Sequence, residues 1–116
     1  MKKIAVYGIP NCDTVKKARA WLDARGVAYT FHDYKKLGIE AAKLRDWVNV
    51  LGWEALLNRR GTAFRKLPDA AREGLDADRA IAIMVEHCST IKRPVVEYPG
   101  GLLLGFRDDE WAAALG

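Results

Sequence analysis

Cys12 is the residue whose type and position in this chain best suit it to chemistry. It lies in a loop, residues 8–14, between an apolar run at residues 4–7 and a stretch with helical periodicity at residues 15–25. The first turn of a helix has free backbone N–H groups and the positive end of the helix dipole, and both stabilise a thiolate. Because the thiolate is the nucleophilic form of cysteine, this position predicts an activated thiol.

The neighbours of Cys12 bear on this prediction in opposite directions. Asn11 and Asp13 are polar, which argues against a cysteine that merely packs as a small hydrophobic residue. The Asp13 carboxylate, in contrast, would raise the pKa of a nearby thiol. The second cysteine, Cys88, ends a helical segment with no motif around it, so a structural role is expected. Without a Cys-x-x-Cys pair, a second thiol that resolves a mixed disulfide must come from another molecule or from Cys88.

Length and composition indicate a single globular domain spanning residues 1–116. Half of the residues are hydrophobic, enough for a core, and 29% are charged, which does not indicate disorder. Two cysteines are too few for a disulfide framework. His32 and His87 lack ligand spacing around them, so no metal site is expected.

The charge balance and the hydropathy pattern restrict the partners. The net charge is +4 and the pI is about 9.2, but the basic residues are spread along the chain, which argues against direct nucleic-acid binding. A few arginines gathered around an anionic ligand would give the same positive net charge. No apolar run approaches the roughly 20 residues that span a bilayer. The apolar run near the start is too short for a signal peptide, so we expect a cytoplasmic protein without a membrane partner.

Periodicity and turn residues predict the elements that position Cys12. Strands are expected at residues 3–7, 27–34, 94–98 and 102–104. Helices are expected at residues 15–25, 39–57 with a break at Gly52, 77–87 and from Asp108 onward, and residues 67–69 indicate a turn and a further helix start. Gly26 is expected to end the first helix, and Asp76 is expected to cap the helix at residues 77–87.

The order of these elements predicts the topology. A strand–helix–strand unit implies a parallel pair with a right-handed crossover. Residues 99–101, Pro-Gly-Gly, imply an antiparallel hairpin. Together these units predict a mixed four-stranded sheet covered by helices. This is an α/β, thioredoxin-like fold with a helical insertion at about residues 38–90.

Several uncommon motifs, in order along the whole chain, resemble the ArsC/Spx superfamily, and most closely its YffB-like branch. The active-site segment of that superfamily is similar to residues 7–18, Tyr-Gly-Ile-Pro-Asn-Cys-Asp-Thr-Val-Lys-Lys-Ala. The resemblance continues at residues 31–34, 51–58, 60–62, 91–94 and 103–106. It implies a thioredoxin-like fold with an inserted helical subdomain, a redox-active cysteine at Cys12, and a cis peptide bond before Pro94, in a loop that faces Cys12.

Arsenate reductases of this superfamily bind their oxyanion with arginines, and the resemblance transfers these by position. Arg93 matches directly, and Arg60 fits the Spx and YffB pattern. The third position is occupied by Phe106, with Arg107 beside it. The segment Cys-Gly-Thr-Ser of true arsenate reductases is also replaced here, by residues 12–15. Both departures count against arsenate as the main substrate. Arg93, Arg60, Asn11 and Arg107 are therefore the candidate substrate-binding residues.

These observations predict a glutathione-dependent thiol–disulfide reductase of the arsenate reductase-like type. Cys12 would form the mixed disulfide, and glutathione, whose two carboxylates suit guanidinium groups, would be the co-substrate. A glutaredoxin is the expected protein partner, the substrate is a small anion or a disulfide, and no bound cofactor is expected. Two alternatives remain: an Spx-like transcription regulator that binds RNA polymerase, and arsenate reduction. Typical Spx proteins use a Cys-x-x-Cys switch, whose second position here is Val15.

Each other candidate has a structural alternative. Arg93 would otherwise form a surface salt bridge, and Arg60 would belong, with Arg59 and Arg65, to a solvated basic face. His32 is expected to be structural. Trp47, Trp53 and Trp111 are expected to lie in the core.

Overall fold

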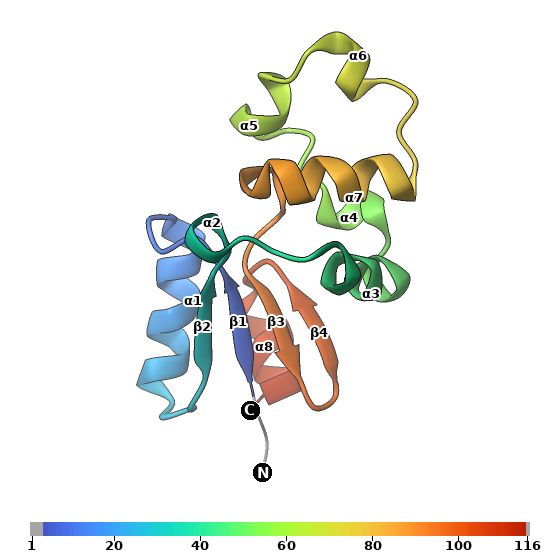
Figure 1. Cartoon of the computed structure of the whole chain (residues 1–116). Coiled ribbons are helices and arrows are strands. Elements are labelled where there is room, and N and C mark those ends of the chain that lie inside the picture. The colour runs from blue at the N-terminus through green and yellow to red at the C-terminus, as the bar shows by residue number, and fades with distance from the viewer. Residues whose placement is uncertain (1–3, 116) are drawn as a thin grey trace. The chain divides into compact units, whose positions relative to one another are not determined.

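The computed structural model describes residues 4–115, and these form two compact units (Figure 1). The sheet unit consists of the residues up to Leu37 together with those from Arg93 onward. The helical unit, Gly38–Lys92, interrupts it in the sequence. No helix among residues 4–115 is long and apolar enough to cross a membrane.

A four-stranded mixed sheet forms the centre of the sheet unit, with the strand order β2-β1-β3-β4. Strand β1 pairs in parallel with β2 and antiparallel with β3, and β3 pairs antiparallel with β4. The strands are β1 Ala5–Gly8, β2 Thr30–Asp33, β3 Val95–Tyr98 and β4 Gly101–Leu104. The parallel pair is connected through helix α1, Asp13–Ala24. This arrangement confirms the mixed sheet that the sequence predicts.

The core of the sheet unit joins one face of the sheet to α1 and to the C-terminal helix α8, Asp108–Leu115. Its buried members are Val6, Ala18, Trp21, Leu22, Val96, Leu103 and Trp111. The ring of Trp111 lies edge-on to the rings of Trp21 and Phe106. Its Nε1 donates to the carbonyl oxygen of Gly105 at 3.1 Å, and Nε1 of Trp21 donates to Oδ1 of Asp108 at 2.9 Å. These contacts hold α1 in place.

Tyr7 and His32 form a stacked pair across the two parallel strands. Their ring centroids are 4.5 Å apart and their planes differ by 12°. The Tyr7 hydroxyl donates to Oε1 of Glu97 on β3 at 3.1 Å. These contacts agree with the structural role expected for His32.

The helical unit consists of short helices packed around buried apolar residues. Its helices are α3 Ala41–Leu51, α4 Trp53–Leu56, α5 Thr62–Arg65, α6 Asp69–Arg72 and α7 Ala77–Glu86, followed by a 3-10 turn, Cys88–Thr90. Gly52, with φ of 85°, separates α3 from α4 as predicted. Asp76 caps α7 as predicted, because its carboxylate accepts from the backbone N–H of Arg79 at 2.8 Å.

The elements at the N-terminal side differ from the sequence prediction in their bounds. Lys3, the expected start of the first strand, lies outside the described residues. The first helix begins two residues earlier than predicted, because Cys12 itself takes the extended N-cap conformation. The second strand ends at Asp33, whose Oδ1 accepts from the backbone N–H groups of Lys35 and Lys36 and so starts the unpredicted helix α2, Tyr34–Leu37.

Trp53, an expected core residue, is only partly buried, and the apolar Val85 is exposed. Val85 is 38% exposed on α7, although Ala80, Ile81 and Met84 of the same helix are buried. Trp53 is half-buried at the start of α4, with the guanidinium of Arg59 5.4 Å from its ring centroid. Periodicity identified the helix faces but not where each face ends.

Candidate active site

Cys12 is the N-cap residue of α1. Its backbone is extended, with φ of −139° and ψ of 125°, and its carbonyl oxygen accepts from the N–H of Lys16 at 2.9 Å. Gly8, at the end of β1, permits the close approach of α1, since a Cβ on Gly8 would lie 2.9 Å from Cγ2 of buried Val15. The strand and the helix thus place a half-buried thiol at the helix N-terminus.

The surroundings of Cys12 favour its thiolate. Burial by itself raises the pKa of the thiol, but the backbone N–H of Val15, the Arg93 side chain and the backbone N–H of Thr14 together outweigh it, so the pKa is lowered from 9.0. The thiol makes no capping hydrogen bond of standard geometry. The first-turn N–H groups therefore act on the charged sulfur as nearby donors.

Arg93 is the side chain that the structure brings to Cys12. It contributes both a hydrogen bond and a positive charge to the sulfur. Its Nε atom is buried, and the peptide bond to Pro94 is cis, as the resemblance implies. A guanidinium here can stabilise the thiolate and bind an anionic group at the same time.

Asn11 and Arg107 also belong to the sheet unit but are engaged locally. Asn11 is exposed, and its Oδ1 accepts from Nζ of Lys16 at 3.4 Å. Arg107 pairs through Nε with Glu110 at 3.2 Å and with Asp109 at 3.9 Å. Neither side chain contributes to the shifted pKa of Cys12.

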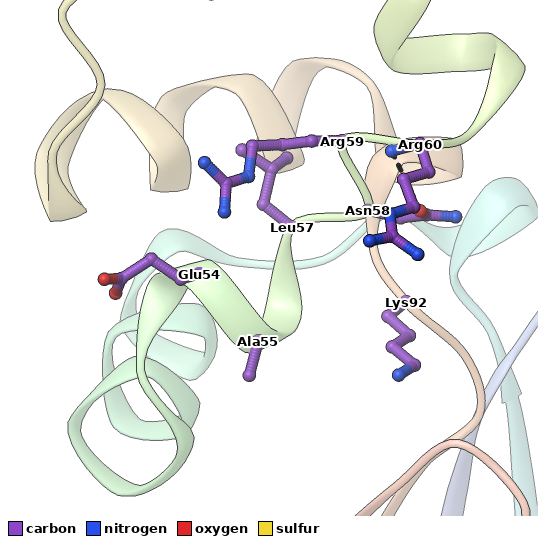
Figure 2. Close-up of a pocket in the computed structure, with 7 residues that line it drawn as sticks. All are labelled: Glu54, Ala55, Leu57, Asn58, Arg59, Arg60 and Lys92. Atoms are coloured by element: carbon purple, nitrogen blue, oxygen red, sulfur yellow. Dashed lines mark hydrogen bonds between the residues drawn. The ribbon is translucent and has the colours of Figure 1, made fainter.

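Arg60 belongs to the helical unit, where it lines a pocket of about 520 Å³ (Figure 2). The lining residues are Glu54, Ala55, Leu57, Asn58, Arg59, Arg60 and Lys92. Sequence reasoning singled out Arg60 but missed Lys92 and Glu54, which no motif marks as binding residues.

Cys88 is in a different environment from Cys12. It begins the 3-10 turn of the helical unit, and its Sγ is 3.7 Å from the carbonyl oxygen of Val85. Burial raises the pKa of its thiol above 9.0, although backbone hydrogen bonds from Cys88 and Ile39 partly oppose this. The thiol is therefore the less reactive of the two. Among residues 4–115, no group of three or more His, Cys, Asp or Glu side chains could hold a metal ion.

Comparison with known proteins identifies the family. A family model described as the ArsC family matches residues 7–114. The chain belongs to the ArsC family. Its mixed sheet with an inserted helical unit is the thioredoxin-like fold, as predicted.

Individual ArsC-family relatives agree with this assignment. The solved structure of a YffB protein is 52% identical, with a TM-score of 0.95, over 97% of this chain and 99% of that one. An uncharacterised protein of Haemophilus influenzae is 39% identical over 96% of this chain and 97% of its own length. The global transcriptional regulator Spx 1 of Lactococcus lactis is 27% identical over 97% of this chain and 88% of its own length.

Proposed function

We propose that this protein is a glutathione-dependent thiol–disulfide reductase in which Cys12 is the nucleophile. The observation that supports this most is the lowered pKa of Cys12, produced by first-turn N–H groups and Arg93 against the effect of burial. The thiolate is the form of cysteine that attacks disulfides, and a lowered pKa raises its share at a given pH. The reaction requires a reducing compartment, and we propose that this is the cytoplasm.

The proposed reaction takes two exchange steps. The Cys12 thiolate attacks the glutathione sulfur of a mixed disulfide, the Cys12–glutathione bond forms, and the substrate thiolate leaves and takes up a proton. The thiolate of a second glutathione then attacks the glutathione sulfur on Cys12. This glutathione acts by itself or is presented by a glutaredoxin. Glutathione disulfide leaves, and the Cys12 thiolate is restored. In the net reaction one glutathione thiol is oxidised: the mixed disulfide and one glutathione become the substrate thiol and glutathione disulfide.

We assign the anionic groups of the substrate and of glutathione to arginines. Arg93 lies at the sulfur, and its guanidinium can hold a carboxylate in forked geometry. Arg60 lines the pocket of the helical unit. Asn11 and Arg107 remain secondary candidates, because both side chains are engaged with residues of their own segments.

The function is tested by replacing one sulfur atom. Cys12→Ser should abolish both the mixed disulfide with glutathione, measured by mass spectrometry, and the reduction of a glutathionylated peptide. Cys88→Ser is the matched control and should retain both. Reduction of the peptide by Cys12→Ser at the rate of the unsubstituted protein would show that the mechanism is wrong.

An Spx-like regulatory function is the first alternative, supported by the 27% identity to Spx 1. The second position of a Cys-x-x-Cys switch is Val15, which is fully buried in the sheet unit. A thiol switch of the usual Spx kind cannot form there. A pull-down with the C-terminal domain of the RNA polymerase α-subunit distinguishes the alternatives, and no retention is expected.

Arsenate reduction is the second alternative, and the third arginine position argues against it. Phe106 takes that position, and its ring lies 4.9 Å from that of Trp111 and 6.3 Å from that of Trp21, among aromatic core residues. Arg107 is paired with Glu110 instead. Turnover of arsenate with glutathione and glutaredoxin should therefore be weak or absent.

A further inference from the structure

Strand β2 is the outermost strand of the sheet, and within residues 4–115 no strand pairs with its outer side (Figure 1). On its inner side, the backbone N–H of Thr30 donates to the carbonyl oxygen of Ile4 at 2.9 Å. Because the backbone groups of successive strand residues point to opposite sides, those of Phe31 point away from β1. This edge therefore offers a backbone donor and a backbone acceptor to another extended chain.

The side chain of Phe31 lies on the face of the sheet that α1 covers. Its partner on β1, Val6, is buried in the core on that face, and Phe31 packs against this core. Tyr29, two residues earlier, packs against the same core. Since side chains alternate along a strand, a chain added at this edge would place every second side chain on the same face, beside these two rings.

A pocket of about 370 Å³, which we call the edge pocket, lies between α1 and the start of β2. Its lining residues are Arg19, Asp23, Val27, Ala28, Tyr29 and Phe31. All of them belong to the sheet unit. The edge pocket and the unpaired side of β2 thus share Phe31, so a single ligand can engage both.

Two aromatic rings hold the guanidinium of Arg19 in the edge pocket. Its Cζ lies 4.2 Å from the ring centroid of Phe31 and 5.9 Å from that of Tyr29. Its Nε donates to the Tyr29 hydroxyl at 3.1 Å. Among the described residues, no other hydrogen bond and no ion pair engages this guanidinium. The stacked guanidinium therefore keeps its remaining N–H groups for an anion, in an orientation set before binding.

Asp23 gives the edge pocket a second charge. It is exposed, and no ion pair within residues 4–115 includes it. Because α1 runs back between two parallel strands, Asp23 lies closer than Arg19 to the start of β2. The edge pocket thus presents a cation beside Phe31 and a carboxylate toward Tyr29.

We propose that the β2 edge binds an extended segment of a partner protein as an added antiparallel strand, with an acidic side chain of the segment against Arg19 and a basic one, two residues later, against Asp23. The acidic residue lies opposite Phe31 and exchanges both backbone hydrogen bonds with it. Antiparallel pairing is the more stable kind, and in this direction the basic residue lies opposite Tyr29. The proposal does not rest on the thiol chemistry, because Cys12 lies at the other end of α1.

Amide hydrogen exchange of the full chain, followed by NMR, tests the backbone pairing. The probe is the peptide acetyl-Thr-Val-Glu-Val-Lys-Val-Thr-amide. It should slow exchange at the N–H of Phe31 several-fold, whereas the N–H of Thr30, already bonded to Ile4, should change little. The same peptide N-methylated at its Glu cannot donate to Phe31 and should give no protection. Absence of probe binding, or an unprotected Phe31 amide at saturating probe, would overturn the added strand.

Fluorescence anisotropy of the labelled probe tests the charge pattern. Arg19→Gln should weaken binding about fivefold, the scale of a partly exposed ion pair, yet leave unchanged the binding of a peptide with Gln in place of Glu. Lys17→Gln is the matched control: Lys17 is an exposed lysine of α1 outside the edge pocket, and both peptides should bind this variant normally. Equal losses for the two peptides in Arg19→Gln would show a distorted edge and not a lost ion pair.

The order of the charges tests the direction of the segment. A peptide in which Glu and Lys exchange places has the same composition and should bind more weakly than the probe. Equal or tighter binding of this peptide contradicts the proposed antiparallel segment.

Two other occupants of the edge are distinguished in the same way. N-Acetylglutamate that binds as tightly as the probe would make the edge pocket a small-molecule site. A concentration-dependent dimer in analytical ultracentrifugation, lost in Arg19→Gln, would make the occupant a second copy of this chain. Either result would overturn the assignment to a partner segment.

Discussion

The reactivity of Cys12 is decided by a competition around a single sulfur atom. Partial burial favours the neutral thiol, whereas two backbone N–H groups and Arg93 favour the thiolate, and the second effect is the larger. Asp13, which the sequence suggested would oppose the thiolate, is exposed and does not contribute to the shift. Water screens an exposed carboxylate strongly, which explains its small influence.

The two cysteines should titrate in different pH ranges. A thiol is alkylated through its thiolate, so the rate rises as pH rises through the pKa. The pKa is lowered from 9.0 for Cys12 and raised above 9.0 for Cys88. Alkylation by iodoacetamide, followed by peptide mapping, should therefore reach half its maximum rate below pH 9.0 at Cys12 and above it at Cys88. The same midpoint at both sites would contradict this account.

Arg93→Gln should move the pKa of Cys12 upward. The substitution removes the positive charge and the hydrogen bond but keeps a polar side chain, and the first-turn N–H groups remain. At pH 7 the alkylation rate of Cys12 should fall several-fold, and its pH midpoint should rise. Arg25→Gln, at the other end of α1, removes an exposed charge of the same unit and should leave the midpoint unchanged. An equal shift in both variants would indicate a general effect of net charge.

At the scale of elements, the site depends on the contact between β1 and α1. Gly8 ends the strand and Val15 lies in the first turns of the helix, with no room for a side chain between them. Cys12 lies on the chain between these two contact points. The packing of Gly8 against the Val15 side chain therefore determines where the helix N-terminus, and with it the thiol, is held.

Gly8→Ala should destabilise the protein by about 1–3 kcal/mol, because the new Cβ overpacks against Val15. Urea unfolding followed by circular dichroism measures the loss. In the Gly8→Ala, Val15→Ala double variant the added methyl gains the space that Val15 vacates. The loss in the free energy of unfolding of the double variant should thus be smaller than the sum of the two single losses, by about 1 kcal/mol. Strict additivity would show that the two residues do not meet.

Most elements were predictable because local signals marked their ends. Glycines at positive φ mark the ends of two helices, Gly26 at 67° and Gly52 at 85°, and Asp76 marks the start of a third. The four-residue helices α2 and α5 were not predicted. Helices this short gain little from propensity and depend on tertiary contacts that a sequence pattern does not show.

The candidate site was predictable to a similar degree. The position of Cys12 between a strand and a helix, and of Arg93 before Pro94, is visible in the sequence. The geometry of the pocket is not visible in the sequence. Lys92 and Glu54 line the same pocket because a single backbone bridge joins Leu57 to Ile91. A bridge of one residue pair leaves no period in the sequence.

At the scale of the whole molecule, its four tryptophans are unequal in burial. Trp111 is 1% exposed and packs against two aromatic rings, whereas Trp53 is half-buried beneath Arg59. Trp111→Ala should cost about 3–5 kcal/mol in the free energy of unfolding. Trp53→Ala should cost about 1 kcal/mol, the scale of a partly exposed cation–π contact. Thermal unfolding of both variants measures the difference. Equal losses would show that Trp111 contributes no more to the core than Trp53 does.

The discontinuous sheet unit has a consequence for the order in which the protein is made. Strand β1 needs β3, and Cys12 needs Arg93, yet both partners follow the whole helical unit in the chain. Because a ribosome releases the N-terminal part first, Cys12 emerges long before its guanidinium partner has been added. The nascent thiol lacks this source of activation until the helical unit has been made. The chain therefore acquires its full nucleophile only after Gly38–Lys92 has been synthesised and Arg93 added.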